Sequence, residues 1–410
     1  MAKTPDQQQH PILRSMANTP DDVLHELFIR LPAKLVARMR CVCKSWNGFL
    51  TTPSFIKSHL DHSKNTNKEI LLEFEADGYP FFDFENPCTA EYSQPLNLEI
   101  PNFLKFPVNT PPFDSFYLIG SVNGLICFVD EGSLRCPTPG VHIWNPSLSA
   151  FLTLPPYSTG SKCKDKYLWF GFDPKTDDYK VVKVIRIEGA DIRNEWPVEV
   201  YSMRKGVWEV ISERFPSHVR NLSRNELGVG WHDGRVHWLG YNYMTQQLTI
   251  VAFDLDEKTF CEIPVPDCKK DCRITTHQMI FLGMWNDKLC LMSYNRRGNL
   301  QVWLMNKYKV AESWVGSYFF NKYLLDLDES PFRFILNNES RFLAYGNRLC
   351  LYDPAAKSFK YMGELTRPYS IIVRYVDSLV WVAPSKSGSP VATAADSKLK
   401  RKINVIDGES

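Results

Sequence analysis

Residues 18–60 read NTPDDVLHELFIRLPAKLVARMRCVCKSWNGFLTTPSFIKSHL, and the interpretation of the whole chain starts from this stretch. Its first part has the character of a helix. Thr19 is a suitable N-cap, Pro20 suits the first helical position, and the two aspartates that follow favour the positive end of a helix dipole. Pro32 then ends this helix. The apolar residues between these points recur at helical spacing and define one face: Leu24, Leu27, Phe28 and Leu31.

Two further short helices are predicted in the same stretch. One begins near Ala33, and the other runs through Trp46 and ends at Pro53. The second helix alternates apolar with basic residues, the apolar ones being Leu35, Val36, Met39 and Val42. We therefore predict a small three-helix domain over residues 18–60. A flexible leader over residues 1–17 precedes it, and a polar linker over residues 61–68 follows.

Beyond residue 68 the helical periodicity vanishes, and short β-branched and aromatic runs alternate with turn-forming residues. One pattern repeats: an aromatic residue precedes a turn-former, and a second aromatic follows six positions after the turn-former. This pattern predicts a strand, a tight turn and a return strand. The five copies are Trp144-Asn145 with Phe151, Phe172-Asp173 with Tyr179, Tyr201-Ser202 with Trp208, Phe253-Asp254 with Phe260, and Tyr352-Asp353 with Phe359. A second signature precedes several copies: Asn123-Gly124, Asp233-Gly234 and Asn286-Asp287.

These hairpins recur at a period near fifty residues, which is typical of a β-propeller. We predict an α+β multidomain chain whose residues 69–383 form an all-β, propeller-like domain of about six four-stranded blades. The leftover strands 69–84 and 370–382 are expected to close the ring as one blade built from both ends of the domain. The alternative is an irregular β-sandwich. The other blades are assigned to residues 116–156, 167–212, 228–266, 278–318 and 331–364.

The opening stretch resembles the F-box. The elements that match are Pro20-Asp21-Asp22, Arg30-Leu31-Pro32, Lys34 to Arg38, the run from Arg40 to Trp46 (RCVCKSW), Pro53, Phe55 and His59-Leu60. Thr19 departs from a usual leucine, and Leu35-Val36-Ala37 replaces a more usual Ser-Leu-Leu, which trims apolar contact. The resemblance implies binding to a Skp-type adaptor within a cullin–RING ubiquitin ligase. The residues assigned to this contact are Pro20, Leu24, Leu27, Leu31, Pro32, Val36, Val42, Cys43, Lys44 and Trp46.

A unit this small cannot bury all its apolar faces, so a partner's helices are expected to cover them. The alternative is that these faces pack on the protein's own β domain.

The region that follows resembles the plant F-box-associated domain, which is kelch-related. The matching elements are Ser121-x-Asn123-Gly124-Leu125, Trp144-Asn145-Pro146, Gly171-Phe172-Asp173-Pro174, the run from Asp177 to Val182 (DDYKVV), and Val200-Tyr201-Ser202 with Trp208. Relatives with this layout include F-box/kelch-repeat proteins and the S-locus F-box group. The resemblance implies a substrate-recognition subunit of a Skp–cullin–F-box ubiquitin ligase, which binds a target protein for ubiquitination and proteasomal degradation. A non-degradative F-box scaffold and a propeller enzyme are the alternatives.

The target-binding surface is expected in loops at one end of the propeller. Candidate loops are 130–141, 157–166, 188–197, 213–227 and 241–247, but the sequence does not assign them to either end. The loops 188–197 and 213–227 are long and charged. They supply the candidate contacts with the target: Asp191, Arg193, Glu195, Arg214, His218 and Arg220.

Several functions lack a sequence signature. The net charge of +2 gives no bias toward nucleic acid or membrane. Ser121 stands one position early for a nucleophile elbow, and no phosphate-binding glycine loop occurs. Cys268, Cys272 and His277 form the best metal candidate, but they lack a paired fourth ligand. We expect an adaptor without a cofactor, a metal or its own catalytic site.

The chain's location is expected to be cytoplasmic, nuclear or both. The eleven cysteines are an odd number, and the sequence opens without the apolar core of a secretory signal. Residues 384–410 are expected to be a disordered tail. Its basic run, residues 398–402, is read as a solvated tail, with a nuclear localisation signal as the alternative.

Overall fold

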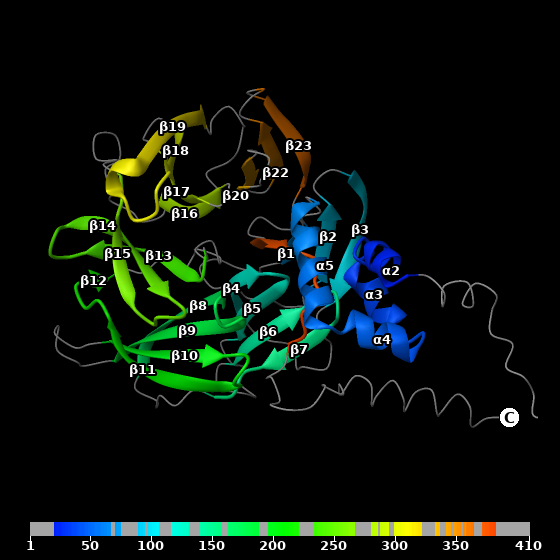
Figure 1. Cartoon of the computed structure of the whole chain (residues 1–410). Helices are drawn as coiled ribbons and strands as arrows, with labels where there is room; N and C mark the ends of the chain where they lie inside the picture. The colour runs from blue at the N-terminus through cyan, green and yellow to red at the C-terminus, as the bar shows by residue number, and fades with distance from the viewer. Residues whose placement is uncertain are drawn as a thin grey trace, which may run out of the picture.

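The computed structural model describes residues 20–66, 70–74, 89–94, 97–105, 116–130, 140–156, 163–187, 196–220, 233–266, 280–285, 288–294, 299–321, 333–336, 342–345, 348–353, 356, 358–364 and 371–382. It comprises a helical unit, residues 20–66, followed by a β-propeller-like domain (Figure 1). Within the described residues, no helix is long and apolar enough to cross a lipid bilayer.

The helical unit contains four helices rather than the three predicted. They are α2 (Asp21–Phe28), α3 (Ala33–Met39), α4 (Lys44–Leu50) and α5 (Pro53–Asn65). The prediction was wrong at Pro53, which starts α5 instead of only ending α4. Proline fits the first turn of a helix because its missing N–H would have no partner there. The Thr52 hydroxyl caps this helix by accepting a hydrogen bond from the Phe55 N–H.

The structure also corrects the predicted linker and the predicted start of the first helix. The expected linker over residues 61–68 is helical as far as Asn65, because α5 continues through it. The first helix begins at Asp21, one residue later than expected, with Pro20 in extended conformation at the N-cap position. Thr19 lies outside the described residues. The predicted start at Ala33 and the helix through Trp46 are confirmed.

The described strands form six four-stranded antiparallel sheets. The first contains β4 (Phe116–Val122), β5 (Leu125–Asp130), β6 (Val141–Asn145) and β7 (Ala150–Thr153). The second contains β8 (Cys163–Asp173), β9 (Asp178–Ile187), β10 (Trp196–Ser202) and β11 (Val207–Phe215). The third contains β12 (Val219–Arg220), β13 (Arg235–Asn242), β14 (Gln247–Asp254) and β15 (Phe260–Pro264).

Two more sheets follow along the chain. They are β16 (Ile280–Trp285) to β19 (Trp314–Asn321) with β17 (Lys288–Tyr294) and β18 (Asn299–Met305), and β20 (Arg333–Leu336) to β23 (Ser358–Glu364) with β21 (Phe342–Tyr345) and β22 (Arg348–Asp353). A short 3-10 helix, η2 (Ala311–Ser313), precedes β19.

The last sheet joins the two ends of the domain. Its order is β24 (Ile371–Tyr375), β1 (Ile70–Phe74), β2 (Thr89–Gln94) and β3 (Asn97–Lys105). The predicted pairing of the first and last strands is confirmed, with Leu72 opposite Val373. The predicted strand 370–382 was too long, since β24 ends at Tyr375 and residues 376–382 have no regular structure. The sequence reasoning had not predicted β2 and β3.

All five predicted hairpins are confirmed in register. The paired aromatics are Trp144 with Phe151, Phe172 with Tyr179, Tyr201 with Trp208, Phe253 with Phe260, and Tyr352 with Phe359. The sheets follow one another around a ring, and the hydrophobic cores lie between neighbouring sheets (Figure 1). Trp169 of β8 stacks on Trp238 of β13 with 4.0 Å between ring centroids. This ring of sheets is not the irregular sandwich considered as the alternative.

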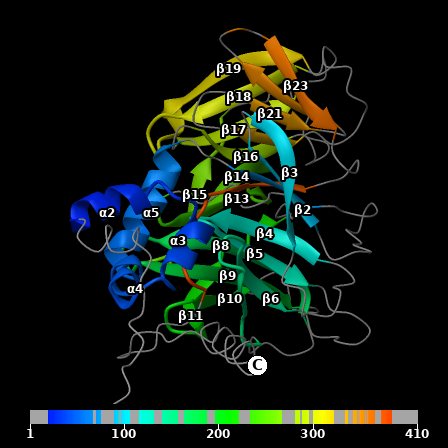
Figure 2. The same ribbon diagram turned by 90° about the vertical axis from the view of Figure 1, so that its right-hand side faces the viewer.

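Strand order defines two ends of the ring. In a consecutively paired sheet, the first-to-second and third-to-fourth turns lie at one end, and the second-to-third connection lies at the other. At the first of these ends, turns of the sheets β8–β11 and β12–β15 contact each other. The β4–β5 turn at the same end contacts the residues that follow β24. The helical unit packs at this end, which we call the helix end (Figure 2). We call the other end the far end.

Candidate docking surfaces

The helical unit has its own core. Its buried residues are Leu24, Phe28, Ala33, Val36, Trp46, Leu50 and Phe55, and Phe28 meets Trp46 edge to face with ring centroids 4.9 Å apart. Three residues assigned to the adaptor contact, Leu24, Val36 and Trp46, therefore lie inside this core. They shape the helical surface and are not part of what it exposes. Burial against the chain itself replaces the cover expected from a partner at these positions.

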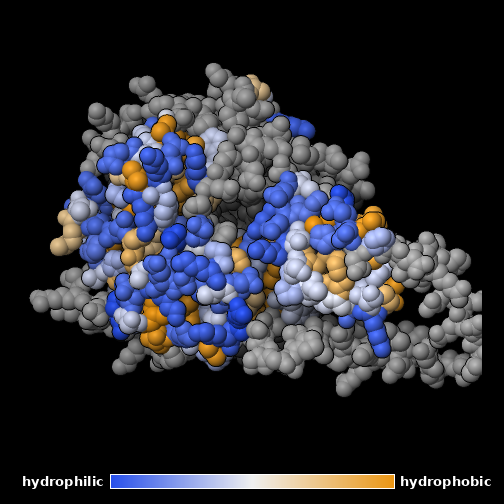
Figure 3. All heavy atoms as spheres, in the orientation of Figure 1, coloured by the Kyte–Doolittle hydropathy of each residue, from blue (hydrophilic) through white to orange (hydrophobic). Residues whose placement is uncertain are grey.

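The remaining residues of that set lie at the surface. Leu27 and Val42 are 48% and 41% exposed, and Leu31 is half-buried. Pro20, Pro32, Cys43 and Lys44 are exposed. Apolar spheres gather over the helices on the right of Figure 3. Exposed apolar side chains on short helices are candidates for contact with another protein.

Two exposed apolar residues of the same helices were missed by the sequence reasoning. Val23 of α2 is 47% exposed and Leu35 of α3 is 38% exposed. Both were visible as apolar positions in the sequence, but periodicity alone did not show which side of each short helix faces solvent. The structure adds them to the exposed surface that holds Leu27 and Val42.

The turn between α3 and α4 is organised by a cysteine. Cys43 occupies the N-cap position of α4, where its Sγ accepts a hydrogen bond from the Trp46 N–H at 3.4 Å. This contact ties the exposed Cys43 and Lys44 to the buried Trp46. Cys41 and Cys43 are both free thiols.

One core residue of the helical unit comes from the opposite end of the chain. Leu379 is completely buried among the helix residues, and Leu148 of the β6–β7 turn packs against the same cluster. We call residues 376–382, which follow β24, the strap. His59 of α5 is buried close by, and its Nε2–H donates to the Leu31 carbonyl at 2.9 Å. Burial lowers the pKa of His59; His62 and Arg40 also lower it, whereas the Leu31 carbonyl and Asp377 raise it.

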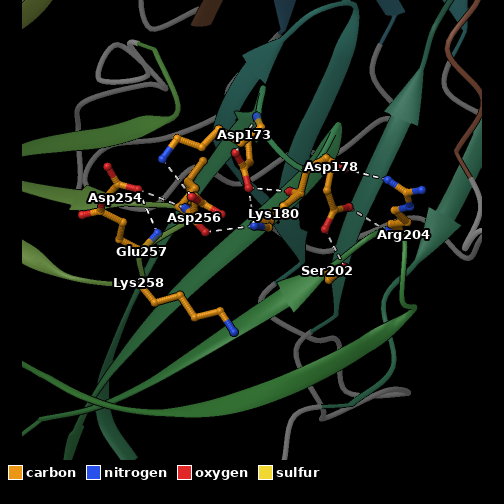
Figure 4. A network of polar contacts seen from close by, with 12 residues as sticks. Asp173, Asp178, Lys180, Ser202, Arg204, Asp254, Asp256, Glu257 and Lys258 are labelled. Atoms are coloured by element: carbon orange, nitrogen blue, oxygen red, sulfur yellow. Dashed lines mark hydrogen bonds and ion pairs between the residues drawn. The ribbon is translucent and has the colours of Figure 1, made fainter.

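The helix end also carries a polar network that joins the sheets β8–β11 and β12–β15 (Figure 4). The Lys180 ammonium donates to Asp173 at 2.6 Å and to the Leu255 carbonyl of the next sheet at 2.9 Å. Burial raises the pKa of Asp173, but the hydrogen bonds from Lys180 and Thr176 outweigh it, so that the pKa is lowered. Asp178 accepts from Ser202 at 2.5 Å and from the Arg204 N–H at 2.8 Å. The network bridges two sheets.

The candidate target contacts are only partly described. Asp191, Arg193 and Glu195 lie outside the described residues, as does the Arg220 side chain. Arg214 donates to the Ile211 carbonyl at 2.8 Å. His218, which is partly exposed, lies 2.5 Å from Glu262, and Asn242 donates to the other oxygen of that carboxylate at 3.2 Å. The structure thus brings His218 together with a carboxylate that sequence reasoning did not select.

Strand order also sorts the candidate loops. Residues 131–140, 188–195 and 243–246 each connect the second strand of a sheet to the third. The strand ends that they join therefore lie at the far end. Met244 in the β13–β14 turn is 82% exposed there. Residues 221–232, by contrast, join the first and second strands of their sheet. Arg220 pairs with Tyr241 beside the far end, whereas Arg235 pairs with Asp254 at the helix end, so the two strand ends that they join lie at opposite ends of the ring. This separation was not available from the sequence.

The described residues contain no group of three or more histidine, cysteine, aspartate or glutamate side chains placed to hold a metal ion. The candidate Cys268, Cys272 and His277 lies outside the described residues. Cys261 is partly buried in β15.

A helical unit with exposed apolar side chains, fixed to one end of a ring of sheets, defines a β-propeller-like protein with a helical docking module. The sequence matches the F-box domain over residues 20–58 and the F-box associated beta propeller domain over residues 72–337. The chain therefore belongs to the F-box-associated β-propeller family and carries an F-box.

Curated relatives agree with this assignment. An F-box protein of Arabidopsis thaliana is 27% identical over 386 residues, which cover 84% of this chain and 87% of the relative. An F-box/kelch-repeat protein of the same plant is 25% identical and covers 72% and 78% of the two chains. The Arabidopsis thaliana F-box protein CPR1 is 27% identical and covers 73% and 72%. A solved prolyl endopeptidase structure covers 88% of this chain and 56% of its own, but its 7% identity and TM-score of 0.35 carry no argument.

Proposed function

We propose that this protein is the substrate-recognition subunit of a Skp–cullin–F-box ubiquitin ligase. The F-box docks a Skp-type adaptor, and the β-propeller binds a target protein for ubiquitination and proteasomal degradation. One observation carries the proposal: the helices that match the F-box expose apolar side chains, while their own core is already filled. Such a surface gains from being covered by a partner.

The adaptor contact is assigned to two groups of residues. The exposed and half-exposed ones form the contact itself: Pro20, Val23, Leu27, Leu31, Pro32, Leu35, Val42, Cys43 and Lys44. The buried ones, Leu24, Val36 and Trp46, hold the helices in the arrangement that presents this surface.

The target is proposed to bind at the far end of the propeller, away from the adaptor. Strand order supports this proposal, because the strand ends joined by residues 131–140, 188–195 and 243–246 lie there. The candidate residues Asp191, Arg193, Glu195, Arg214, His218 and Arg220 remain predictions for this contact.

The protein's contribution is proximity rather than chemistry of its own. Holding target lysines near a charged conjugating enzyme raises their effective concentration. The proposal requires no cofactor, nucleic acid or membrane, and it places the protein in the cytoplasm, the nucleus or both.

The first test is adaptor binding by a Leu27→Asp variant. We expect affinity for a Skp-type protein to fall about tenfold or more, because burying one leucine contributes about 2 kcal/mol and an unpaired carboxylate costs more. Val207→Asp is the matched control, since Val207 is also 48% exposed but lies on β11 of the propeller. Unchanged affinity of Leu27→Asp, measured by calorimetry, would refute the assigned contact.

The same variant tests degradation. Partners captured by the protein with the proteasome inhibited should persist longer in cells that express Leu27→Asp than in cells that express the wild type. Equal half-lives, together with lost adaptor binding, would instead favour the non-degradative scaffold.

A further inference from the structure

Helix α3 of the F-box begins without a side-chain cap of its own. Its N-cap residue is Pro32, which makes no side-chain cap hydrogen bond. The first N–H groups of a helix need acceptors from outside the helix, and negative charge is favoured there. The acceptor for the Ala33 N–H is Asp377 Oδ2 at 2.6 Å, which lies 344 residues further along the chain. The strap therefore supplies the cap for an F-box helix.

The propeller holds the other side of the same carboxylate. Asp377 Oδ1 accepts a hydrogen bond from the Ser147 hydroxyl in the β6–β7 turn. Ser147 also meets the Tyr375 hydroxyl at 2.7 Å. Asp377 is thus a direct bridge between α3 and the sheet β4–β7.

The strap is fixed along its length by the propeller. The Asn145 amide, which is completely buried, donates to the Ser378 carbonyl at 3.0 Å and to the Val380 carbonyl at 2.7 Å. Between these two anchored carbonyls, Leu379 points into the F-box core. Val382 is buried in the core shared by the sheets β4–β7 and β8–β11. Adjacent strap residues therefore pack in different domains: Leu379 packs in the F-box core, and Val380, Trp381 and Val382 pack in the propeller core.

We propose that Asp377 is a positioning residue, and that through it the strap sets the orientation of the F-box relative to the far end of the propeller. A fixed orientation determines where the adaptor, and the machinery behind it, lies with respect to a bound target. This functional meaning rests on the proposed function, because the reach from conjugating enzyme to target lysine depends on that geometry. The positioning itself is a property of this chain alone.

The test measures the distance between the two domains in the full-length chain. Dyes on genetically encoded amino acids replace Ser45 on α4 and Met244 in the β13–β14 turn, both of which are exposed. Single-molecule energy transfer then reports the spread of distances. We expect Asp377→Ala to broaden the distribution and Asp377→Asn, which keeps an acceptor oxygen, to retain the wild-type width.

A matched control removes another carboxylate at the helix end. Asp256 in the β14–β15 turn pairs with Lys175 of the neighbouring sheet at 2.9 Å and has no described contact with the F-box helices. Asp256→Ala is therefore expected to leave the distribution unchanged. A wild-type distribution in Asp377→Ala would overturn the proposal, as would equal broadening in the control.

A double variant separates positioning from helix stability. Serine is a preferred N-cap, so Pro32→Ser in the Asp377→Ala background gives α3 a local cap without restoring the bridge. The rate of hydrogen exchange over residues 33–36 should rise about fivefold in Asp377→Ala, because the free energy of one capping side chain corresponds to about that factor in an equilibrium constant. In the double variant the rate should return to the wild-type value. The distance distribution should stay broad in the double variant. If it narrows again, Asp377 merely caps a helix and the positioning role is refuted.

The outcome is independent of the proposed function. Adaptor affinity is measured on the unlabelled wild type and on Asp377→Ala, and not on the double variant, because Pro32 belongs to the assigned adaptor contact. Loss of the ligase role would appear as failure of the wild type to bind the adaptor, whereas loss of the positioning role would appear only in the distance distribution.

Discussion

Two sheets of the propeller carry the same pair of sequence signatures and use them differently. The sheet β4–β7 has Asn123-Gly124 and Asn145, and the sheet β12–β15 has Asp233-Gly234 and Asp254. The local turns match closely: Gly124 has φ +80° and Gly234 has φ +74°. The first sheet lies against the strap, and the second lies against its neighbour β8–β11.

The two turn-formers share one role and differ in the other. Asn145 Oδ1 accepts a hydrogen bond from the Leu148 N–H, and Asp254 Oδ1 accepts one from the Glu257 N–H at 3.0 Å. The remaining polar atom is an amide nitrogen in Asn145, which donates to the strap, and a carboxylate oxygen in Asp254, which pairs with Arg235 at 2.9 Å. The shared oxygen acceptor therefore stabilises the turn in both sheets. The choice between amide and carboxylate determines the second partner, which is a strap carbonyl for Asn145 and Arg235 for Asp254.

The glycines show the same division. A Cβ on Gly124 would lie 2.1 Å from Ser378 Cβ and 2.5 Å from the Val376 carbonyl oxygen. A Cβ on Gly234 would find its nearest atom, Pro174 Cδ, at 3.0 Å. Both positions need glycine for their backbone conformation, but only Gly124 is also needed so that the strap can approach closely.

The largest expected effect comes from Gly124→Ala. The left-handed backbone and the overlap with the strap together should lower the free energy of unfolding by about 4 kcal/mol. Gly234→Ala is the matched control and should cost about 1–2 kcal/mol from backbone strain alone. Chemical denaturation followed by tryptophan fluorescence measures both. Equal losses would contradict the difference between the two sheets.

A reciprocal exchange of the turn-formers should have the next largest effect. Asn145→Asp places a buried carboxylate against the two strap carbonyls, and we expect it to cost about 3 kcal/mol. Asp254→Asn keeps the turn and loses a partly exposed ion pair, which should cost about 1 kcal/mol or less. The same denaturation series checks the order. If Asn145→Asp were the milder exchange, the amide would not be what holds the strap.

The smallest expected effect is a pH dependence on the F-box side of the strap. The folded pKa of His59 is lowered mainly by burial, so the unfolded chain takes up a proton first as the pH falls. The stabilisation from a neutral His59 is complete above the unfolded pKa of about 6.5 and is lost as the pH falls through the folded pKa. His59→Gln keeps a donor for the Leu31 carbonyl without this titration. Its denaturation midpoint should fall less steeply between pH 7.5 and 5; an equal slope would exclude His59 as the cause.

The sequence predicted those features that depend on neighbours along the chain. Helix starts at Ala33, hairpin registers such as Trp144 opposite Phe151, and the resemblance to the F-box all follow from local spacing. Local reasoning erred where one residue type serves two purposes. Pro53 both follows one helix and starts the next, and the polar residues 61–65 continue α5 instead of linking domains.

The surface and the joint between the domains needed the tertiary structure. Leu24 and Leu27 belong to one apolar run, yet Leu24 is 6% exposed and Leu27 is 48% exposed. Nothing in the spacing of short apolar stretches separates a core position from a docking position.

The strap shows the same limit over a longer range. The sequence by itself determined a capped helical module and a set of hairpins, because caps, turns and strand alternation act over a few residues. It could not show that Asp377 caps a helix at Ala33 or that Leu379 completes the F-box core, since both contacts join segments more than three hundred residues apart. Only closure of the ring by β24 and β1 brings these segments together.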